Sequence, residues 1–381
     1  MVVQIFNSGV VSGPETLVFP AIPLFREPHV LVFLVEKRWG EKGRIPYEHA
    51  RSLGLRAEIV EVGARFDLSA VGRLRGVIRW LAPSVVHAHD VKATTYAWLA
   101  SRGEKWKCVS THHGVGGRPD WKTRAYEYFY SQVVLPKMNM AIAVSREDEH
   151  TLRMRGLNPQ HLTYVANGVT RKLWTAPDRR AERTRIRSLW AREFAGIDDK
   201  TPIVGMVARL SAEKRHSYFL RVLAALKAAR PEIPWRMIAV GSGALEAQLR
   251  KETAELRLSE QVHWLGYKSD ASSLMPAFDL LAFTSSAEGL PISALEAGWA
   301  GVPVLSSNVG ALPELISTGK TAGGVVFPRE QEHSHTAKSL AWLFEHPAEC
   351  ERMGSRLQNR VAREYSAKAW VDRMESVYRS I

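Results

Sequence analysis

Cysteine, acidic residues and long apolar runs are scarce in this chain of 381 residues. Its two cysteines, Cys108 and Cys350, are far apart and match no metal-binding or redox spacing, which favours a reduced cytoplasmic compartment and two buried thiols. The most apolar windows are residues 16–25 and 30–35, and both are shorter than the roughly 20 apolar residues that a membrane-spanning helix needs. We therefore expect no integral membrane protein.

Two further absences bear on targeting and on metal binding. Residues 1–6 have the pattern of a strand, without a basic leader followed by a long apolar stretch, so we expect no secretory signal. No Asp-x-Asp sequence occurs, so the carboxylate pair that could anchor a divalent ion on a diphosphate is missing. We expect no metal, and we expect basic side chains and helix N-termini to neutralise any bound phosphate.

The shortage of acidic residues leaves 39 of them against 52 lysines and arginines, a net charge of +13. Such a surplus favours a nucleic acid, an anionic membrane surface or phosphorylated substrates as partners, and charge alone does not choose among them. The densest basic stretch, residues 171–192, carries apolar residues such as Ile186 and Trp190 at helical spacing. It predicts a surface helix with a solvated basic face, with a functional basic patch as the alternative.

Short apolar segments alternate with longer amphipathic ones along the whole chain, which is typical of parallel sheets with helices on both faces. The expected strands of the first half span residues 2–6, 30–35, 57–60, 85–87, 108–111, 140–144 and 162–165. Those of the second half span residues 203–207, 236–240, 262–265, 280–283, 303–306 and 324–327. Because the chain is too long for one typical α/β core, we expect two doubly wound domains, residues 1–170 and 171–361. We expect the final helical segment, residues 362–381, to pack back on the first domain.

The motif with the strongest chemical content spans residues 285–296, directly after the expected strand 280–283. Pro291 suits the first turn of a helix that would run to about residue 300. Glu288 then lies in the loop before the helix and Glu296 lies inside it, both beside the crevice where open α/β sheets bind ligands. Carboxylates accept hydrogen bonds from hydroxyl pairs, so the pair suits a sugar at one glutamate and a ribose at the other.

The run from Glu288 to Glu296 resembles the paired-glutamate signature of the retaining family-four glycosyltransferases, which have the two-domain GT-B fold. Similar motifs occur in order along essentially the whole chain, at residues 87–89, 111–114, 143–145, 167–169, 205–214, 264–266, 307–314 and 324–328. The resemblance implies an α/β protein of GT-B architecture, in which two Rossmann-like parallel-sheet domains face a central cleft. The N-terminal domain would bind the acceptor, and the C-terminal domain would bind a nucleotide-sugar donor.

The resemblance also implies a donor site and a set of catalytic groups. The donor-binding residues would be Gly13, Arg209, Lys214, Gly266, Glu288, Gly289, Leu290 and Glu296. Arg209 and Lys214 would hold the diphosphate, Glu288 the donor sugar and Glu296 the ribose. These two cations and Glu288, together with His113 of the first domain, would be the catalytic residues. Arg215 follows Lys214 at a position where relatives usually have glycine.

On the acceptor side, the resemblance implies Gly13, His113 and Asn167. The sequence Gly13-Pro14-Glu15 stands where relatives usually show a double glycine. Either member of the pair His112-His113 could be the active-site histidine, and we favour His113 because it lies in a Thr-x-His-Gly frame at the end of a strand. The alternative is that both histidines only make structural contacts to the backbone.

We therefore expect a retaining, metal-independent glycosyltransferase of the hexosyltransferase type, without a cofactor and with a UDP-sugar favoured over a GDP-sugar as donor. The acceptor would be a glycan or lipid-linked molecule of bacterial cell-envelope polysaccharide or lipopolysaccharide assembly. The alternatives are a GT-B nucleotide-sugar epimerase, a phosphorylase, and a non-catalytic basic scaffold that binds anionic lipid or nucleic acid. Basic and aromatic residues interleave over residues 118–137, which favours peripheral attachment to the inner face of the plasma membrane, with a core-packing helix as the alternative.

Overall fold

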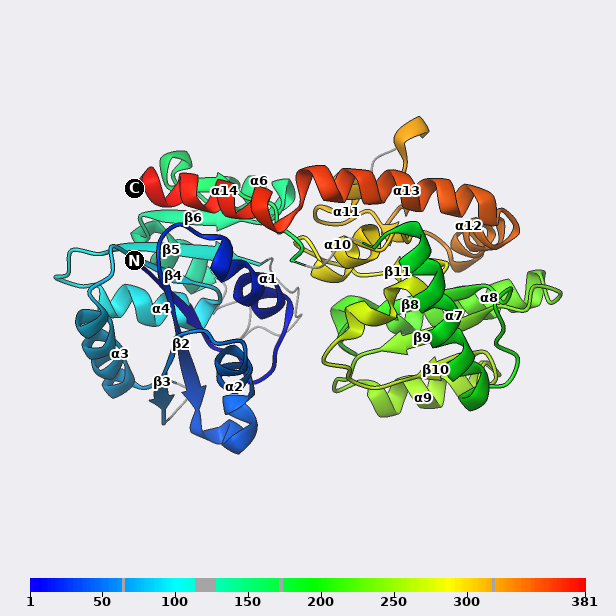
Figure 1. Ribbon diagram of the computed structural model, residues 1–381, viewed down its shortest axis with the longest axis horizontal. Helices are drawn as coiled ribbons and strands as arrows, with labels where there is room; N and C mark the ends of the chain where they lie inside the picture. Colours follow the sequence, from blue (N-terminus) through cyan, green and yellow to red (C-terminus); the bar gives the residue numbers. More distant parts are fainter. Residues whose placement is uncertain (64–65, 114–127, 171–173, 317–318) are drawn as a thin grey trace. The chain divides into compact units, whose positions relative to one another are not determined.

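The computed structural model describes residues 1–63, 66–113, 128–170, 174–316 and 319–381. The chain forms two compact units, the first made of residues 1–170 and 366–381 and the second of residues 171–365 (Figure 1). Each unit is built around one parallel sheet. This is the doubly wound α/β architecture that the alternating pattern predicts.

The first unit has a seven-stranded sheet in the order β3-β2-β1-β4-β5-β6-β7. Its strands are β1 (Val2–Phe6), β2 (His29–Glu36), β3 (Ala57–Val62), β4 (Val85–Ala88), β5 (Lys107–His112), β6 (Met140–Ala143) and β7 (Leu162–Tyr164). The order reverses between β1 and β4, and open parallel sheets bind their ligands at the carboxyl ends of the strands beside such a reversal.

The second unit has a six-stranded sheet in the order β10-β9-β8-β11-β12-β13, with its reversal between β8 and β11. Its strands are β8 (Ile203–Val207), β9 (Arg236–Val240), β10 (Val262–Trp264), β11 (Leu280–Phe283), β12 (Val304–Ser307) and β13 (Gly324–Phe327). The strands that the sequence predicts in both halves occur, with bounds shifted by at most two residues. Strand positions follow closely from the pattern because buried parallel strands are short, almost wholly apolar runs.

Helices flank both sheets (Figure 1). In the first unit they are α1 (Gly13–Ala21), α2 (Ile45–Ser52), α3 (Leu68–Leu81), α4 (Val91–Ala100), α6 (Arg146–Met154) and α14 (Ala367–Arg379), with the 3₁₀ segment η2 (Lys37–Arg44). In the second unit they are α7 (Ala176–Glu193), α8 (His216–Ala229), α9 (Glu246–Glu255), α10 (Ile292–Trp299), α11 (Leu312–Ile316), α12 (His333–Glu345) and α13 (Pro347–Glu364), with η6 (Ala212–Lys214). N-cap side chains define where several helices begin. Asp67 caps α3 and Asp90 caps α4, each by accepting a hydrogen bond from a backbone amide of the first turn. Pro291 is the N-cap of α10 and not its first helical residue.

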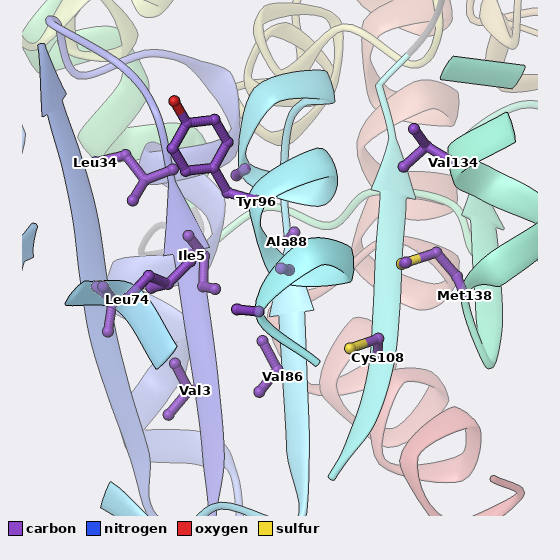
Figure 2. Close-up of a cluster of buried hydrophobic side chains, with 14 of the residues drawn as sticks. Val3, Ile5, Leu34, Leu74, Val86, Ala88, Tyr96, Cys108, Val134 and Met138 are labelled. Carbon is purple, nitrogen blue, oxygen red and sulfur yellow. The ribbon is translucent and has the colours of Figure 1, made fainter. Parts of the chain in front are cut away.

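The core of the first unit lies where its strands meet the helices that cover them. Figure 2 shows Val3 and Ile5 of β1, Val86 of β4 and Cys108 of β5 among these buried side chains. Both cysteines are free and buried, as the sequence predicts. Burial raises the pKa of the Cys108 thiol to about 11, so the thiol stays protonated and behaves as an apolar side chain.

The basic helix α7 corrects the expectation of a wholly solvated arginine face. Arg187 is buried, and its guanidinium donates to Asp279 Oδ2 at 2.7 Å and to carbonyl oxygens of the surrounding loops, including that of Thr201 at 2.9 Å. Arg183 binds the other oxygen of the same carboxylate at 2.7 Å. An arginine can be buried when a carboxylate and several carbonyls satisfy its donors, and a helical hydrophobic pattern does not reveal that environment.

The C-terminal helix α14 belongs to the first unit, as we expected from the sequence (Figure 1). The Arg26 amide donates to Glu375 Oε1 at 2.8 Å, and Val169 pairs with Ser366 in a parallel bridge. Gly168 permits this contact, because a Cβ there would lie 2.7 Å from the Trp370 side chain. The chain therefore crosses to the second unit after Thr170 and returns at Ser366.

The described helices include none that is long and apolar enough to cross a membrane. Much of the predicted membrane-binding segment, including Arg118, Trp121 and Tyr126, lies outside the described residues. In its described remainder Tyr128 is 68% exposed, whereas Tyr130 is buried.

Candidate active site

The donor-side residues lie at the carboxyl ends of β8 and β11, beside the reversal in strand order of the second sheet. The loop after β8 is held by the loop after β9, since the Leu210 amide donates to Ser242 O at 3.0 Å. A Cβ at Gly241 would lie 2.0 Å from the Ala208 carbonyl oxygen, so only glycine allows the two loops to approach this closely. This packing fixes the segment that carries Arg209 and leads into η6, which ends at Lys214.

Lys214 and Glu288 form the central contact of this site. The ammonium Nζ of Lys214 lies 2.6 Å from Glu288 Oε1, although the two residues are 74 positions apart in the chain. Both side chains are largely buried, with exposed fractions of 16% and 7%. The Ser285 hydroxyl donates to the same Glu288 oxygen at 2.6 Å. An ammonium has three donors, so Lys214 retains hydrogens for an anionic ligand while Glu288 holds it in place.

Backbone contacts hold the β11 loop against η6 and so fix this pair. The Thr284 hydroxyl donates to the Lys214 carbonyl oxygen at 3.0 Å, and the Ser286 amide donates to Glu213 O at 2.8 Å. The Ser307 hydroxyl of β12 donates to Ser285 O at 2.7 Å. The motif around Glu288 includes Ser285, but sequence reasoning gave that serine no role because its contact depends on how the loop folds.

Arg209 pairs with a different carboxylate from Lys214. Its guanidinium is 69% exposed and lies 3.3 Å from Glu213 Oε1, which also accepts a hydrogen bond from the Ser211 hydroxyl at 2.6 Å. Burial raises the pKa of Glu213, but the Ser211 hydroxyl and the charges of Arg209 and Lys214 outweigh burial and lower it overall. Glu213 therefore stays ionised and orients the arginine, whose exposed donors are available to a phosphate.

The remaining donor-side residues of the prediction lie on neighbouring loops and on α10. Gly310 has φ 57°, and a Cβ there would lie 2.2 Å from the Glu288 carbonyl oxygen, so the loop after β12 presses on Glu288. Gly289 accepts a hydrogen bond from the Ala311 amide at 2.9 Å, and Leu290 is buried. Glu296 is half-buried within α10. Gly266, after β10, has φ 67° and accepts a hydrogen bond from the Gly241 amide at 2.8 Å.

Arg215 has a backbone conformation that explains why glycine is usual at its position. Its φ of 51° and ψ of 43° lie in the left-handed region, which a side chain destabilises by roughly 1–2 kcal/mol. The guanidinium donates to the Arg329 carbonyl oxygen at 2.7 Å and lies 4.7 Å from the ring centroid of Tyr218. These contacts offset part of the strain and tie the loop after β13 to η6.

The first unit contains a buried network of neutral polar groups that sequence reasoning missed. Gln4 of β1 donates through Nε2 to Tyr378 of α14 at 3.1 Å and to His29 at 3.0 Å, and its Oε1 lies 2.6 Å from His89 Nε2. Tyr378 in turn lies 2.8 Å from His87 Nδ1. Because Gln4 Oε1 can only accept, His89 Nε2 carries the proton and its Nδ1 is a bare acceptor. The Tyr378 hydroxyl accepts from Gln4, and its own hydrogen is available to His87 Nδ1.

His89 and His113 lie at the carboxyl ends of β4 and β5, with ring centroids 5.9 Å apart. His112 belongs to β5 itself, and its ring stacks on Tyr130 at 5.8 Å. Alternation along the chain thus gives the two neighbouring histidines different surroundings. Burial lowers the pKa of His113 to about 3, so its ring is neutral at physiological pH. Among the described residues, neither His89 Nδ1 nor His113 Nε2 has a hydrogen-bond partner.

Gly13 is the first residue of α1, and the Glu15 carboxylate accepts hydrogen bonds from Ser12 N at 2.9 Å and from the Ser12 hydroxyl at 2.6 Å. Asp90 joins the β1 loop to the β4 loop by accepting from the Asn7 amide at 2.7 Å. Burial raises the pKa of Asp90 to about 7. These carboxyl groups fix the loop that leads into Gly13.

Asn167, the third acceptor-side residue, is buried in the segment that follows β7. The next residues, Gly168 and Val169, contact Trp370 and Ser366 at the start of α14. Within the described parts of the chain, no cluster of three His, Cys, Asp or Glu side chains could hold a metal ion.

Two parallel Rossmann-like sheets, each with polar groups at the carboxyl ends of the strands beside its reversal, define the GT-B class of proteins. The solved structure of HepE from Anabaena in complex with UDP-glucose has this fold, with a TM-score of 0.82 and 17% identity over 100% of this chain and 99% of HepE. The model described as Glycosyltransferase Family 4 matches residues 27–172, and the one described as Glycosyl transferases group 1 matches residues 191–360. The chain belongs to these retaining, metal-independent glycosyltransferases, as the paired-glutamate motif led us to expect.

Curated relatives agree with this assignment. The putative glycosyltransferase EpsF of Bacillus subtilis is 26% identical over 278 residues, which are 71% of this chain and 70% of EpsF. The lipopolysaccharide core biosynthesis mannosyltransferase LpsB of Rhizobium meliloti is 24% identical over 223 residues, which are 57% of this chain and 59% of LpsB. The chain therefore spans less than two thirds of the length of LpsB.

Proposed function

We propose that this protein transfers a hexosyl unit, with retention at the anomeric carbon, from a UDP-sugar to a hydroxyl group of a glycan or lipid-linked acceptor. The observation that carries the proposal is the Lys214–Glu288 contact of 2.6 Å at the carboxyl ends of β8 and β11. It combines a cation for a leaving diphosphate with a carboxylate that can accept hydrogen bonds from a sugar. The presence of UDP-glucose in the HepE complex supports UDP over GDP as the nucleotide.

The chemistry follows from the groups in the second unit. The glycosidic bond to the diphosphate breaks, the acceptor oxygen bonds to the anomeric carbon on the same face, and the departing phosphate oxygen takes the acceptor proton. The charge that develops on the diphosphate is stabilised by Lys214 and Arg209, without a metal ion. Glu288 orients the sugar together with the Gly289 and Leu290 amides, so no carboxylate nucleophile is required.

The other predicted residues have binding roles in this proposal. Glu296 holds the ribose, and Gly266 lines the nucleobase pocket. In the first unit, Gly13 and Asn167 contact the acceptor, and His113 contacts the sugar as a neutral ring. Catalysis then consists mainly of positioning and of electrostatic stabilisation of the leaving group.

The acceptor belongs, on this proposal, to bacterial cell-envelope polysaccharide or lipopolysaccharide assembly. The name of LpsB, which acts in lipopolysaccharide core biosynthesis, supports that class. We also propose a cytoplasmic protein attached peripherally to the inner face of the plasma membrane, because the chain carries a net charge of +13. Flotation with anionic vesicles at low and high salt tests the attachment, and absence of binding at both salt concentrations would refute it.

A thermal-shift screen with UDP-, GDP- and ADP-sugars tests the donor assignment. A ligand that binds only the folded state raises the apparent stability of the protein. We expect a UDP-sugar to raise the Tm of the wild type and to have little effect on Lys214→Ala. Product analysis of the same UDP-sugar without acceptor tests the epimerase and scaffold alternatives. Release of an isomerised nucleotide sugar would indicate an epimerase, and absence of both donor binding and donor hydrolysis would indicate a non-catalytic scaffold.

A further inference from the structure

The first unit has two adjoining cavities at the open edge of its sheet, beside β3. One has a volume of about 880 Å³ and the other about 680 Å³. Lys37 and Glu61 line both cavities, so the two are neighbours, and we call them together the edge trough. Glu61 lies near the carboxyl end of β3 and Lys37 directly after β2. The trough therefore begins at the carboxyl ends of the strands, where open parallel sheets bind their ligands.

The trough is joined to the loop after β1, in which Gly13 is the predicted acceptor-side residue. Trp39 of η2 packs on that loop, because a Cβ at Gly9 would lie 3.3 Å from its ring. The neighbouring Gly40 of η2 lines the smaller cavity. A molecule that extends from the β1 loop along η2 would therefore reach the edge trough.

Trp80 of α3 lines the larger cavity at some distance from the strand ends, and it is 66% exposed. The Arg56 guanidinium lies 5.2 Å from the centroid of its ring. Gly76 is one helical turn before Trp80 and also lines the cavity, and a Cβ there would have no atom within 4 Å. An exposed indole beside an open space offers a large, rigid and apolar surface for a flat ligand.

Charges of both signs line the trough. The cations are Lys37, Lys42, Arg44 and Arg73, and the carboxylates are Glu36, Glu41, Glu48, Glu61 and Asp67. Many of them form pairs, such as Arg44 with Glu61 at 3.1 Å and Arg73 with Asp67 at 3.2 Å. An anion would meet the carboxylates, a cation would meet the arginines and lysines, and an apolar ligand would offer hydrogen bonds to none of them. A neutral ligand with many hydroxyl groups suits both kinds of group.

We propose that the edge trough binds a neutral oligosaccharide segment of the acceptor, with one sugar ring stacked on Trp80. Sugar rings combine an apolar face of C–H groups, which stacks on an indole, with hydroxyls that donate to carboxylates and accept from arginine and lysine. The inference rests on the proposed function, because it extends the acceptor away from the reacting hydroxyl. The trough gives the enzyme a preference for acceptors of several sugars over short ones.

Binding of defined oligosaccharides to the full chain tests this proposal without any assay of turnover. The probes are neutral gluco-, manno- and galacto-oligosaccharides of increasing length, and saturation-transfer NMR measures their affinity. Oligogalacturonates and chitosan oligosaccharides of the same lengths show whether the trough prefers neutral, anionic or cationic sugars. We expect affinity to rise with length for at least one neutral series, and we expect Trp80→Ala to lower it about tenfold, a factor typical of the loss of one aromatic stacking partner.

Matched variants separate stacking from folding. Trp80→Phe keeps an aromatic ring and should retain most of the affinity. Trp342→Ala removes a 41% exposed tryptophan from α12 in the second unit and should leave the affinity unchanged. The proposal is overturned if no neutral series binds, if Trp80→Ala binds as the wild type does, or if a charged series binds more tightly. Thermal shifts with UDP-glucose on the same variants judge the donor site independently, so the two proposals fail separately.

Discussion

The two units differ in the charge of the polar groups near the carboxyl ends of their strands. In the first unit, Gln4, His87, His89 and Tyr378 are joined by hydrogen bonds between neutral groups, and burial lowers the pKa of both histidines. In the second unit, the pair of Lys214 and Glu288 is charged. A neutral network fixes the direction of each hydrogen bond without attracting ions, whereas a buried cation with spare donors favours an anionic ligand. In the proposed function, the first unit binds an acceptor with hydroxyl groups and the second unit binds a diphosphate.

The largest expected effect is a difference between the units in sensitivity to acid. Burial lowers the pKa of five histidines of the first unit, namely His29, His87, His89, His112 and His113. The unfolded chain binds these protons below about pH 6.5 while the folded chain does not, so the histidines destabilise the fold as the pH falls from 6.5 towards 4. Each one costs up to about 1.4 kcal/mol per pH unit. In the second unit, burial lowers the pKa of three histidines, that of His216 and His263 to about 4 and that of the half-buried His333 as well.

Asp90, in the same unit, changes the stability of the fold with pH in the opposite direction to the histidines. Its folded pKa of about 7 lies above that of an unfolded aspartate, so the stability that its protonated form contributes is present at low pH and is lost as the pH rises towards 7. It partly offsets the five histidines. Asn resembles the protonated carboxyl, so Asp90→Asn should make the loss of stability on acidification steeper. Hydrogen exchange at pH 7.5 and 5.5 measures both units at once, and equal loss of protection in the two units would contradict the comparison.

The second prediction concerns catalysis and the charged site. Lys214→Ala and Arg209→Ala should each lower turnover by about 10²-fold or more, because in the proposed mechanism the two cations stabilise charge that develops on the diphosphate in the transition state. Arg209→Lys should rescue only in part, since a guanidinium can hold two phosphate oxygens at once and an ammonium cannot. Initial rates in excess EDTA decide whether a metal shares this role. A wild-type enzyme that EDTA silences and magnesium restores would overturn the mechanism.

A third prediction separates the two glutamates. Glu296→Ala should weaken the binding of free UDP by about 1.5–3 kcal/mol, which is typical of a hydrogen bond to a charged group. Glu288→Ala should leave UDP affinity nearly intact and lower turnover, because its proposed partner is the sugar. Calorimetry with UDP measures the first effect, and initial rates measure the second. Equal losses of UDP affinity in both variants would show that the roles are assigned wrongly.

The sequence predicts the strands and the Glu288 loop because their signals are local. A buried strand is a short apolar run, and Glu288 lies in a motif whose turn and helix start are contiguous. The contact between Lys214 and Glu288 spans 74 positions, and the family resemblance, not the spacing, assigned both residues to one site. Ser285 and the left-handed conformation of Arg215 depend on how the loops fold, so they have no signal in the pattern alone.

The network of the first unit was beyond sequence reasoning for a different physical reason. Gln4 and Tyr378 are 374 positions apart, and each lies in an element whose pattern indicates only a buried strand or an amphipathic helix. A polar residue in an apolar strand shows that a partner is needed, because an unpaired buried amide is costly, but it does not say which partner. Arg187 is the equivalent case in the second unit, since its carboxylate partner Asp279 lies far along the chain, in the segment just before β11.

The smallest expected effect tests whether the neutral network acts through the orientation of its hydrogen bonds. Tyr378→Phe removes the hydroxyl that accepts from Gln4 and lies 2.8 Å from His87 Nδ1, with little change in shape. Leaving these buried groups unpaired should lower the free energy of unfolding by about 1–3 kcal/mol. Gln4→Leu removes the group that fixes the proton on His89 Nε2, so the tautomer of His89 should become mixed. Nitrogen-15 NMR of labelled histidines reads the tautomers directly, with denaturant unfolding for stability. If His89 keeps its Nε2 proton in Gln4→Leu, Gln4 does not set the tautomer, and the network only packs α14 against β1.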